Sequence, residues 1–394
     1  MADSAEQSKP IYPYIDCVRG YAILLVLNCH LAAWYPDLTW PARRLMSFGW
    51  HGVQLFFLAS ALTLLMSWNF EVSRRGRADV PAFFIRRFFR IAPAYYAAGF
   101  LYALVMPPSD GIDPLQFLTT ATFVNSWHPA WGVWGVPGGW SVSVEFTFYF
   151  LFPIMATFIT SMSRAIVLFL GCVVLACVSN QLFTPALQQT YNPVTVDNFI
   201  YYSFPNQAPV FALGGILFFI VQATKQDRYA KPVKFLARHG TLFACATLAA
   251  FFATAYLTLS HSIGLGAPYV PTFLLACVPL MAFIVVLSAG HRNLFVNRYA
   301  AAMGKVSFSA YLFHIAVFDA LPGTFPAVFH VHQTGFFAIL AYTAAWLIVV
   351  PVVYAVAWCS YRGIELPMMN VGKTLIRSRR LVTAAGGRVR GSHP

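Results

Sequence analysis

The sequence predicts an all-α integral membrane protein, a bundle of about ten transmembrane helices with both termini in the cytoplasm. Hydrophobic residues make up 59% of the chain and charged residues only 10%, whereas soluble domains carry about 25% charged residues. Apolar stretches long enough to cross a bilayer, about 20 residues each, recur along the chain. We place them near residues 15–35, 50–69, 89–107, 140–160, 165–182, 206–223, 241–259, 269–289, 306–321 and 335–358.

The positions of the basic residues predict the orientation. Lys and Arg accumulate in the cytoplasmic loops of membrane proteins, and all 26 of them except Arg43 and Arg44 fall on one side if the N-terminus is cytoplasmic. The net charge of +13 therefore indicates contact with membrane lipids and predicts no nucleic-acid partner. We divide the chain into a cytoplasmic segment (1–14), a transmembrane domain (15–367) and a basic, disordered cytoplasmic tail (368–394).

The first span, "VRGYAILLVLNCH", carries an arginine and a histidine in an apolar run. Arg19 and His30 share one face of a helix and differ by a rise of about 16 Å, and Asp16 lies near the same face. An ionisable group at membrane depth normally faces a bundle interior or a water-filled cavity. We therefore expect this stripe to line an internal cavity, with His30 about halfway across. In the alternative, Arg19 pairs with Asp16 near the headgroups and His30 bonds another helix.

The fourth span, "WSVSVEFTFYFLFP", contains one carboxylate. Glu145 lies about six residues inside the outer end of this helix, and Ser141 and Tyr149 lie one turn away on either side. A lone carboxylate in such a segment needs a partner. We expect Glu145 and His30 to meet near the middle of the membrane.

A polar stripe also marks the ninth span, "KVSFSAYLFHIAV". Ser307, Tyr311 and His314 follow the spacing of one helical face, and His314 lies at nearly the depth predicted for His30. This histidine fits either a functional site or simple packing against another helix.

Three arginines in "FFIRRFFRIAPAYY" lie at the cytoplasmic mouth of the third span. Arg86 and Arg90 share a helical face, and Arg87 lies between them. Guanidinium groups bind phosphate oxygens through paired hydrogen bonds, so this cluster suits a polyphosphate ligand, although the positive-inside rule accounts for it equally well. The seven cysteines form no CxxC pair, and His and carboxylate residues show no metal-site spacing, so no metal site is predicted.

Seven stretches, in this order, resemble the acyltransferase 3 family of membrane-bound bacterial acyltransferases. They are "IDCVRGYAILLVLNCH", "GVQLFFLASALTLL", "FFIRRFFRIAPAYY", "WSVSVEFTFYFLFP", "PVFALGGILFF", "VSFSAYLFHIAV" and "YRGIELP". The resemblance implies a bacterial inner-membrane bundle that transfers an acyl group, most often acetyl, from cytoplasmic acyl-CoA to a sugar hydroxyl. The acceptor would be a glycan or glycolipid, such as lipopolysaccharide or exopolysaccharide, and no cofactor would be permanently bound.

The same resemblance suggests roles for individual residues. His30 matches the presumed catalytic base of the family and Arg19 its accompanying arginine. The cluster of Arg86, Arg87 and Arg90 matches the motif thought to hold the phosphates of CoA, and Glu145 matches the glutamate of the Trp-Ser-x-Ser-x-Glu stretch. Three positions depart from the pattern: Cys17 and Ala61 replace usual glycines, and Phe146 replaces a common second glutamate. The last of these argues against a mechanism that needs paired carboxylates.

Two chemical routes fit these residues. In direct transfer, neutral His30 takes the proton of the acceptor hydroxyl as it attacks the thioester, while Glu145 or Asp16 orients the imidazole. In a ping-pong route His30 is itself acylated. Tyr311, His314 or Ser141 are the candidates to stabilise the oxyanion.

Other functions remain open from the sequence. A small-molecule or lipid hydroxyl is an alternative acceptor. A secondary transporter is the alternative from another class, because buried ionisable residues also occur in carriers. The sequence leaves the acceptor, the acyl group and the oligomeric state undetermined.

Overall fold

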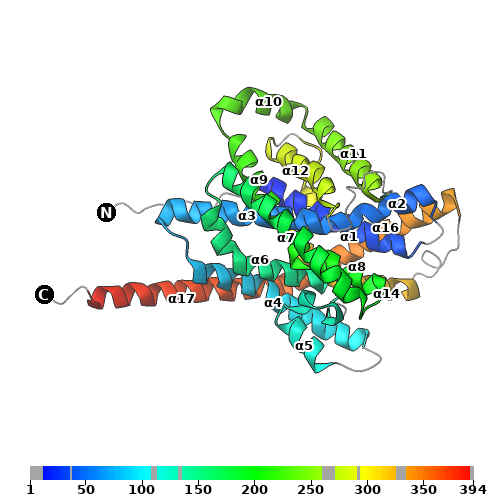
Figure 1. Ribbon diagram of the computed structural model, residues 1–394, viewed down its shortest axis with the longest axis horizontal. Coiled ribbons are helices and arrows are strands. Elements are labelled where there is room, and N and C mark those ends of the chain that lie inside the picture. Colours follow the sequence, from blue (N-terminus) through cyan, green and yellow to red (C-terminus); the bar gives the residue numbers. More distant parts are fainter. Residues whose placement is uncertain are drawn as a thin grey trace.

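The computed structural model describes residues 12–35, 38–107, 113–131, 135–259, 271–290, 293–324 and 334–390. These residues form helices joined by turns and short loops, without strands (Figure 1). Most of the predicted segment 1–14 lies outside the described residues. The expected all-α class is confirmed.

Each of the ten predicted spans corresponds to one helix. These helices are α1 (Pro13–Ala33), α3 (Gly52–Arg75), α4 (Val80–Val105), α6 (Gly139–Phe158), α7 (Met162–Gln188), α9 (Phe204–Ala223), α11 (Gly240–Leu259), α12 (Leu274–Ser288), α14 (Ser307–Thr324) and α16 (Phe336–Ser360). In the described part of the chain, eight helical segments are long and apolar enough to cross a membrane, or nine if the bent pair α13–α14 is one span. At 15 residues, α12 is shorter than a full span.

Shorter elements connect or flank the long helices. They are α2 (Trp40–Ser47), η1 (Phe48–His51), α5 (Pro114–Ala121), η2 (Asn125–Trp127), η3 (Pro129–Trp131), α8 (Pro193–Tyr202), η4 (Asp227–Tyr229), α10 (Ala230–Arg238), α13 (Arg298–Lys305), η5 (Tyr361–Glu365) and α17 (Leu366–Arg390). Helices α1, α3 and α9 are largely buried in the bundle, whereas α7, α11 and α16 expose much of their apolar surface. Exposed apolar surface of this kind is what lipid-facing helices require.

Capping residues at the end of α3 and the start of α4 determine the turn between these helices. Gly76 ends α3 in the left-handed conformation, with φ of 73°, which glycine adopts without steric cost. Asp79 then begins α4, and its carboxylate accepts the backbone N–H of Ala82 at 3.1 Å, which satisfies a free donor of the first turn. The two helices therefore reverse direction within a few residues.

Glycines bring α13 against α1. A Cβ on Gly304 would lie 1.7 Å from the backbone oxygen of Asp16, and one on Gly20 would lie 2.0 Å from that of Ala300. The backbones can approach this closely only because both side chains are absent. The chain then bends by 78° between α13 and α14, which places the start of α14 beside α1.

We expect Gly304→Ala to destabilise the protein by about 1–3 kcal/mol, the usual cost of overpacking, because the added methyl group would push α13 away from Asp16. Gly171→Ala is the matched control, since no atom lies within 4 Å of its added Cβ; helix propensity predicts unchanged or slightly higher stability. Thermal unfolding of the purified protein measures both. Equal melting temperatures for the two variants would show that the contact between α1 and α13 is not tight.

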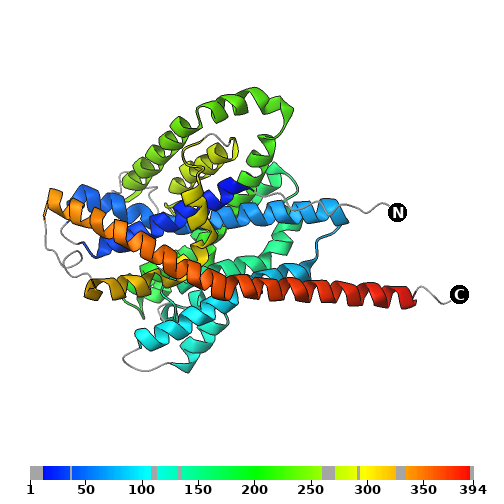
Figure 2. The same cartoon turned by 180° about the vertical axis from the view of Figure 1, so that it is seen from behind.

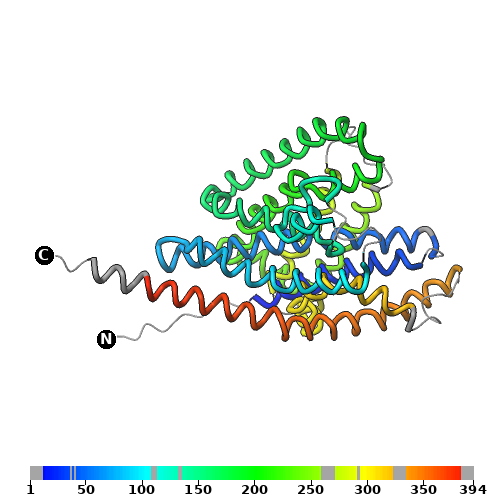
Figure 3. Tube along the Cα trace, turned by 90° about the horizontal axis from the view of Figure 1, so that it is seen from below, coloured from blue at the N-terminus to red at the C-terminus, as the bar shows by residue number. Residues whose placement is uncertain are grey.

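The prediction of a disordered tail at 368–394 is wrong through Arg390, because α17 is helical there. Figures 1 and 2 show α16 and α17 as one long rod that extends past the other helices, and Figure 3 shows this rod along one edge of the bundle. Long-range contacts hold it: Glu365, which is buried, accepts a hydrogen bond from Ser309, and Asp79 pairs with Arg379 and Arg380.

Candidate active site

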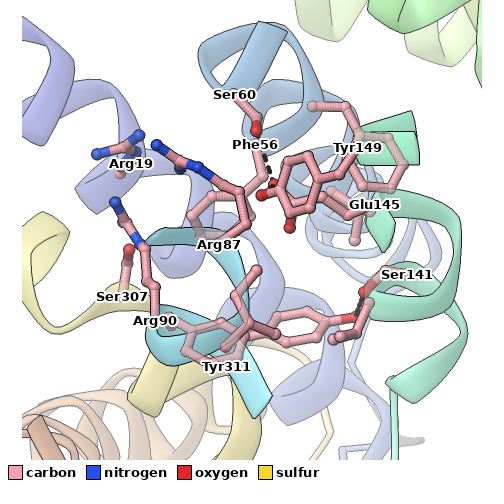
Figure 4. Close-up of a pocket in the computed structure, with 15 residues that line it drawn as sticks. Arg19, Phe56, Ser60, Arg87, Arg90, Ser141, Glu145, Tyr149, Ser307 and Tyr311 are labelled. Carbon is pink, nitrogen blue, oxygen red and sulfur yellow. Dashed lines mark hydrogen bonds between the residues drawn. The ribbon is translucent and has the colours of Figure 1, made fainter. Parts of the chain in front are cut away.

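A polar pocket lies inside the bundle, where α1, α3, α4, α6 and α14 meet. Its lining residues are Arg19, Val53, Phe56, Phe57, Ser60, Arg87, Arg90, Ile91, Ser141, Val142, Glu145, Tyr149, Ser307, Phe308 and Tyr311 (Figure 4). Six of the residues predicted from the sequence therefore come together: Arg19, Arg87, Arg90, Ser141, Glu145 and Tyr311. We call this cavity the central pocket.

Three guanidinium groups oppose one carboxylate across the central pocket. Figure 4 shows Arg19, Arg87 and Arg90 on one side and Glu145 with Tyr149 on the other. In the described residues, no ion pair within 4.0 Å joins Glu145 to any of these arginines. Charged groups inside an apolar bundle are costly unless they are compensated. The excess of positive charge therefore suits an anionic ligand.

Hydrogen bonds fix the carboxylate and one of the arginines. Oε1 of Glu145 accepts hydrogen bonds from Ser60 Oγ at 2.6 Å and from Tyr149 OH at 2.5 Å. Nη2 of Arg19 donates to Thr63 Oγ1 at 3.3 Å. Three helices other than α6 thus contribute to the position of Glu145 and its surroundings, α3 through Ser60 and α1 and α4 through the arginines.

Arg87 has an unused donor in this environment. Its Nε atom is buried and has no hydrogen-bond partner among the described residues, while its guanidinium carbon lies 5.8 Å from the ring centroids of Phe83 and of Tyr149. A buried donor without a partner costs free energy. A ligand with acceptor oxygens would remove that cost.

Two histidines pair beside the central pocket. The ring centroids of His30 and His314 lie 4.8 Å apart with an interplanar angle of 67°, and the ring of Tyr311, which lines the pocket, lies 5.8 Å from that of His314. His314 is buried, whereas His30 is exposed. His30 is therefore the accessible member of the pair.

Backbone carbonyls set the tautomers of both rings. Nδ1 of His30 lies 2.9 Å from the oxygen of Val26, and Nδ1 of His314 lies 2.7 Å from the oxygen of Tyr311. A carbonyl oxygen only accepts, so each Nδ1 carries the proton, and in the neutral ring Nε2 is left as an acceptor. Nε2 of His30, the exposed member of the pair, can therefore accept a proton or act as a nucleophile.

The structure does not bring Glu145 to His30, contrary to the expectation from the sequence. Glu145 is held by Ser60 and Tyr149, while His30 contacts Val26 and His314. The reason is helix packing: α6 packs on α3, α4 and α9, whereas α1 packs on α3, α13 and α14, and α14 places His314 against His30. His30 also lies in the last turn of α1, nearer the helix end than the predicted middle.

Tyr311 and Ser141 form a hydrogen-bonded pair. Ser141 Oγ donates to Tyr311 OH at 2.8 Å, and Tyr311 OH donates to the backbone oxygen of Gly138 at 3.0 Å. Gly138 has φ of 78°, and a Cβ there would lie 2.7 Å from Tyr311 OH. In this arrangement the phenol proton of Tyr311 is already used and is not directed at the central pocket.

A vestibule adjoins the central pocket. It is lined by Tyr12, Ile15, Asp16, Arg19, Thr63, Met66, Ser67, Asn69, Phe70, Ser73, Arg87, Arg90, Gln222 and Lys225. Arg19, Arg87 and Arg90 line both cavities, so an anion that crosses the vestibule meets these guanidinium groups first. Partial burial lowers the pKa of Lys225 at the rim. Asp16 belongs to this vestibule, and no contact in the described chain joins it to His30.

The three predicted phosphate-binding arginines separate into two groups. Arg87 and Arg90 face the central pocket, whereas Arg86 pairs with Glu71 at 3.2 Å. Arg86 therefore does not line the central pocket with Arg90, although the two residues are one turn apart, because its side chain lies against Glu71 of α3. In the described chain, no group of three or more His, Cys, Asp or Glu residues could hold a metal ion.

Four further residues belong to the site, and the sequence predicted no role for them: Ser60, Thr63, Tyr149 and Ser307. Tyr149 follows Glu145 by one helical turn, a spacing that places two side chains on one face. That signal was present in the sequence. The contribution of Ser60 depends on the packing of α3 against α6 and had no local signal.

Comparison with known proteins finds a matching family model and several similar proteins. The family model described as "Acyltransferase domain" matches residues 12–362. The O-acetyltransferase OatA of Staphylococcus aureus is 24% identical over 327 residues, which are 77% of this chain and 50% of that protein. The acyltransferase MdmB of Streptomyces mycarofaciens is 29% identical over 160 residues, 36% of this chain and 38% of that protein. The chain spans about half the length of the first of these relatives. Among solved structures, no match is found.

Proposed function

Because the chain belongs to the acyltransferase 3 family, we propose that it is a membrane-bound O-acyltransferase that moves an acetyl group from cytoplasmic acetyl-CoA to a sugar hydroxyl of a glycan or glycolipid. The observation that carries this proposal is the central pocket, in which three arginines and one glutamate lie inside an apolar bundle beside an accessible histidine. We place the protein in the bacterial inner membrane, with the basic α3–α4 hairpin towards the cytoplasm.

The donor enters through the vestibule. Phosphate oxygens of acyl-CoA bind the guanidinium groups of Arg87 and Arg90, and the pantetheine arm extends past Tyr311 to the histidine pair. The rise of about 16 Å between Arg19 and His30 is comparable to the reach of such an extended arm. The acceptor hydroxyl arrives from the outer end of α1, where His30 is exposed.

Transfer is then a direct attack on the thioester. His30 Nε2 takes the proton from the acceptor hydroxyl as its oxygen bonds to the thioester carbonyl carbon. When the tetrahedral intermediate collapses, the carbon–sulfur bond breaks and the CoA thiolate receives that proton from His30. The bond between Nδ1 and the Val26 oxygen holds the ring in the required tautomer, a role often taken by a carboxylate.

The activity is tested with purified protein in lipid vesicles, labelled acetyl-CoA and an envelope glycan fraction. We expect free CoA thiol to appear together with labelled glycan ester in equal amounts, since each transfer releases one thiol. Omitting the glycan fraction should stop release of the thiol in direct transfer. Uptake of an unmodified solute without thiol release would instead support the transporter and contradict the proposal.

A further inference from the structure

A second basic pocket lies beside the vestibule, between the α3–α4 hairpin and α17. Five arginines line it together with a single carboxylate; these residues are Arg74, Arg75, Arg86, Arg87, Arg380 and Glu71. Four of the arginines come from the hairpin, and Arg380 comes from α17. We call this cavity the basic pocket.

The basic pocket holds more positive charge than its own carboxylate can compensate. Glu71 is shared by Arg75 at 3.1 Å, Arg86 at 3.2 Å and Arg380 at 3.6 Å. Five arginines and one glutamate leave a formal charge of +4 in the lining. Each guanidinium has five N–H donors, so most donors of this cluster remain available for acceptor oxygens.

Asp79 keeps α17 at the edge of this pocket. Its carboxylate pairs with Arg379 and, at 3.2 Å, with Arg380. Partial burial raises the pKa of Asp79, but the N–H of Ala82 and the Arg379 guanidinium lower it by more, so the net pKa lies below its ordinary value. Arg380 uses Nε and Nη2 on Asp79, which leaves the Nη1 hydrogens for another acceptor.

The basic pocket adjoins the route to the active site. Arg87 lines the basic pocket, the vestibule and the central pocket, and Ser67 and Phe70 line both the basic pocket and the vestibule. The partnerless Nε of Arg87 lies at this junction. One long anionic ligand can therefore occupy the basic pocket with its head while its arm reaches the central pocket.

We propose that the basic pocket binds the 3′-phosphorylated ADP head of acyl-CoA, and that Arg380 of α17 together with Arg74 of α3 recognises the 3′-phosphate. At neutral pH this head carries a charge of about −4, because the 3′-phosphate monoester contributes up to two negative charges and the diphosphate bridge contributes one on each phosphate, which matches the lining. Planar guanidinium groups bind such phosphates bidentately. The inference rests on the proposed function, since it assumes that acyl-CoA is the donor.

The test compares CoA with 3′-dephospho-CoA, two probes that differ only in the 3′-phosphate. Isothermal titration of the purified full chain is expected to show that the wild type binds CoA at least about 10-fold more tightly, as a charge-assisted hydrogen bond supplies roughly that factor. In Arg380→Gln the affinity for CoA should fall to nearly that for 3′-dephospho-CoA, while the affinity for 3′-dephospho-CoA is unchanged. Arg377→Gln is the matched control, because Arg377 is exposed on the same helix and should retain the preference.

A second variant controls for the possibility that Arg380→Gln weakens the contacts that hold α17 against the α3–α4 hairpin. Arg74→Gln leaves the contacts of α17 with Asp79 intact and should lower the preference as well. Equal binding of the two probes by the wild type, or an equal loss of affinity for both probes in Arg380→Gln and Arg74→Gln, would overturn the inference. Acetyl transfer without any 3′-phosphate preference would refute this inference alone, whereas a preference without acetyl transfer would refute the proposed function. If the wild type binds neither probe, both fail.

Discussion

Replacing His30 with alanine is expected to reduce acetyl transfer about 10²- to 10⁴-fold, the range that a general base usually contributes. His30 is exposed and its Nε2 is the acceptor that the bond to the Val26 carbonyl leaves free, whereas His314 beside it is buried. Alanine removes the proton acceptor but leaves the arginines of the vestibule in place. Donor affinity should therefore stay within a few-fold of the wild type.

Steady-state rates with labelled acetyl-CoA, together with titration of CoA, separate these two effects. His239→Ala is the control, because His239 is exposed at the end of α10 and far from the central pocket in sequence and packing. It should retain full activity. If His30→Ala remained fully active, the base would have to be another group, and His314 would be examined next.

Replacing Glu145 with glutamine is expected to lower kcat about 10- to 100-fold without weakening donor binding. The carboxylate accepts hydrogen bonds from Ser60 and Tyr149, and bonds to a charged acceptor contribute about 1.5–3 kcal/mol. The carbonyl oxygen of glutamine can still accept both hydroxyl groups at the Oε1 position, but the acceptor is then neutral and an amide NH2 replaces the second carboxylate oxygen. Because a negative charge opposite three arginines is removed, affinity for an anionic donor should stay the same or increase.

Tyr149→Phe provides the graded comparison, because it removes one of the two hydrogen bonds and keeps the carboxylate. Its kcat should fall less than that of Glu145→Gln. The values of kcat and KM for acetyl-CoA are measured for both variants. A large rise in KM with unchanged kcat in Glu145→Gln would mean that the carboxylate serves donor binding and would contradict this prediction.

The helices could be predicted because their signal is local. Runs of apolar residues determine where α1, α6 and α14 lie, and polar residues within those runs identified Arg19, Glu145 and Tyr311. The arginines at the start of α4 also indicated an anionic ligand, although they could not show that Arg87 reaches the central pocket while Arg86 lines only the basic pocket.

The partners of these residues could not be predicted, since they depend on how the helices pack. The close approach of Gly304 to Asp16 and the 78° bend before α14 bring His314 to His30, and no periodicity in the sequence encodes that bend. The helix α17 was missed for a related reason. Its basic, glycine-containing sequence is typical of disorder, but Asp79, which holds it, lies 300 residues away from Arg379.

The most direct test of the account is an electron cryomicroscopy structure of the full chain with a non-hydrolysable acetyl-CoA analogue. We expect its phosphates beside Arg87 and Arg90, its arm along Tyr311, and its acyl carbonyl carbon next to the Nε2 side of His30, with room for a hydroxyl between them. An acyl group held away from the histidine pair, or a ligand that avoids the vestibule and central pocket, would contradict the claim that this cavity is where acetyl transfer occurs.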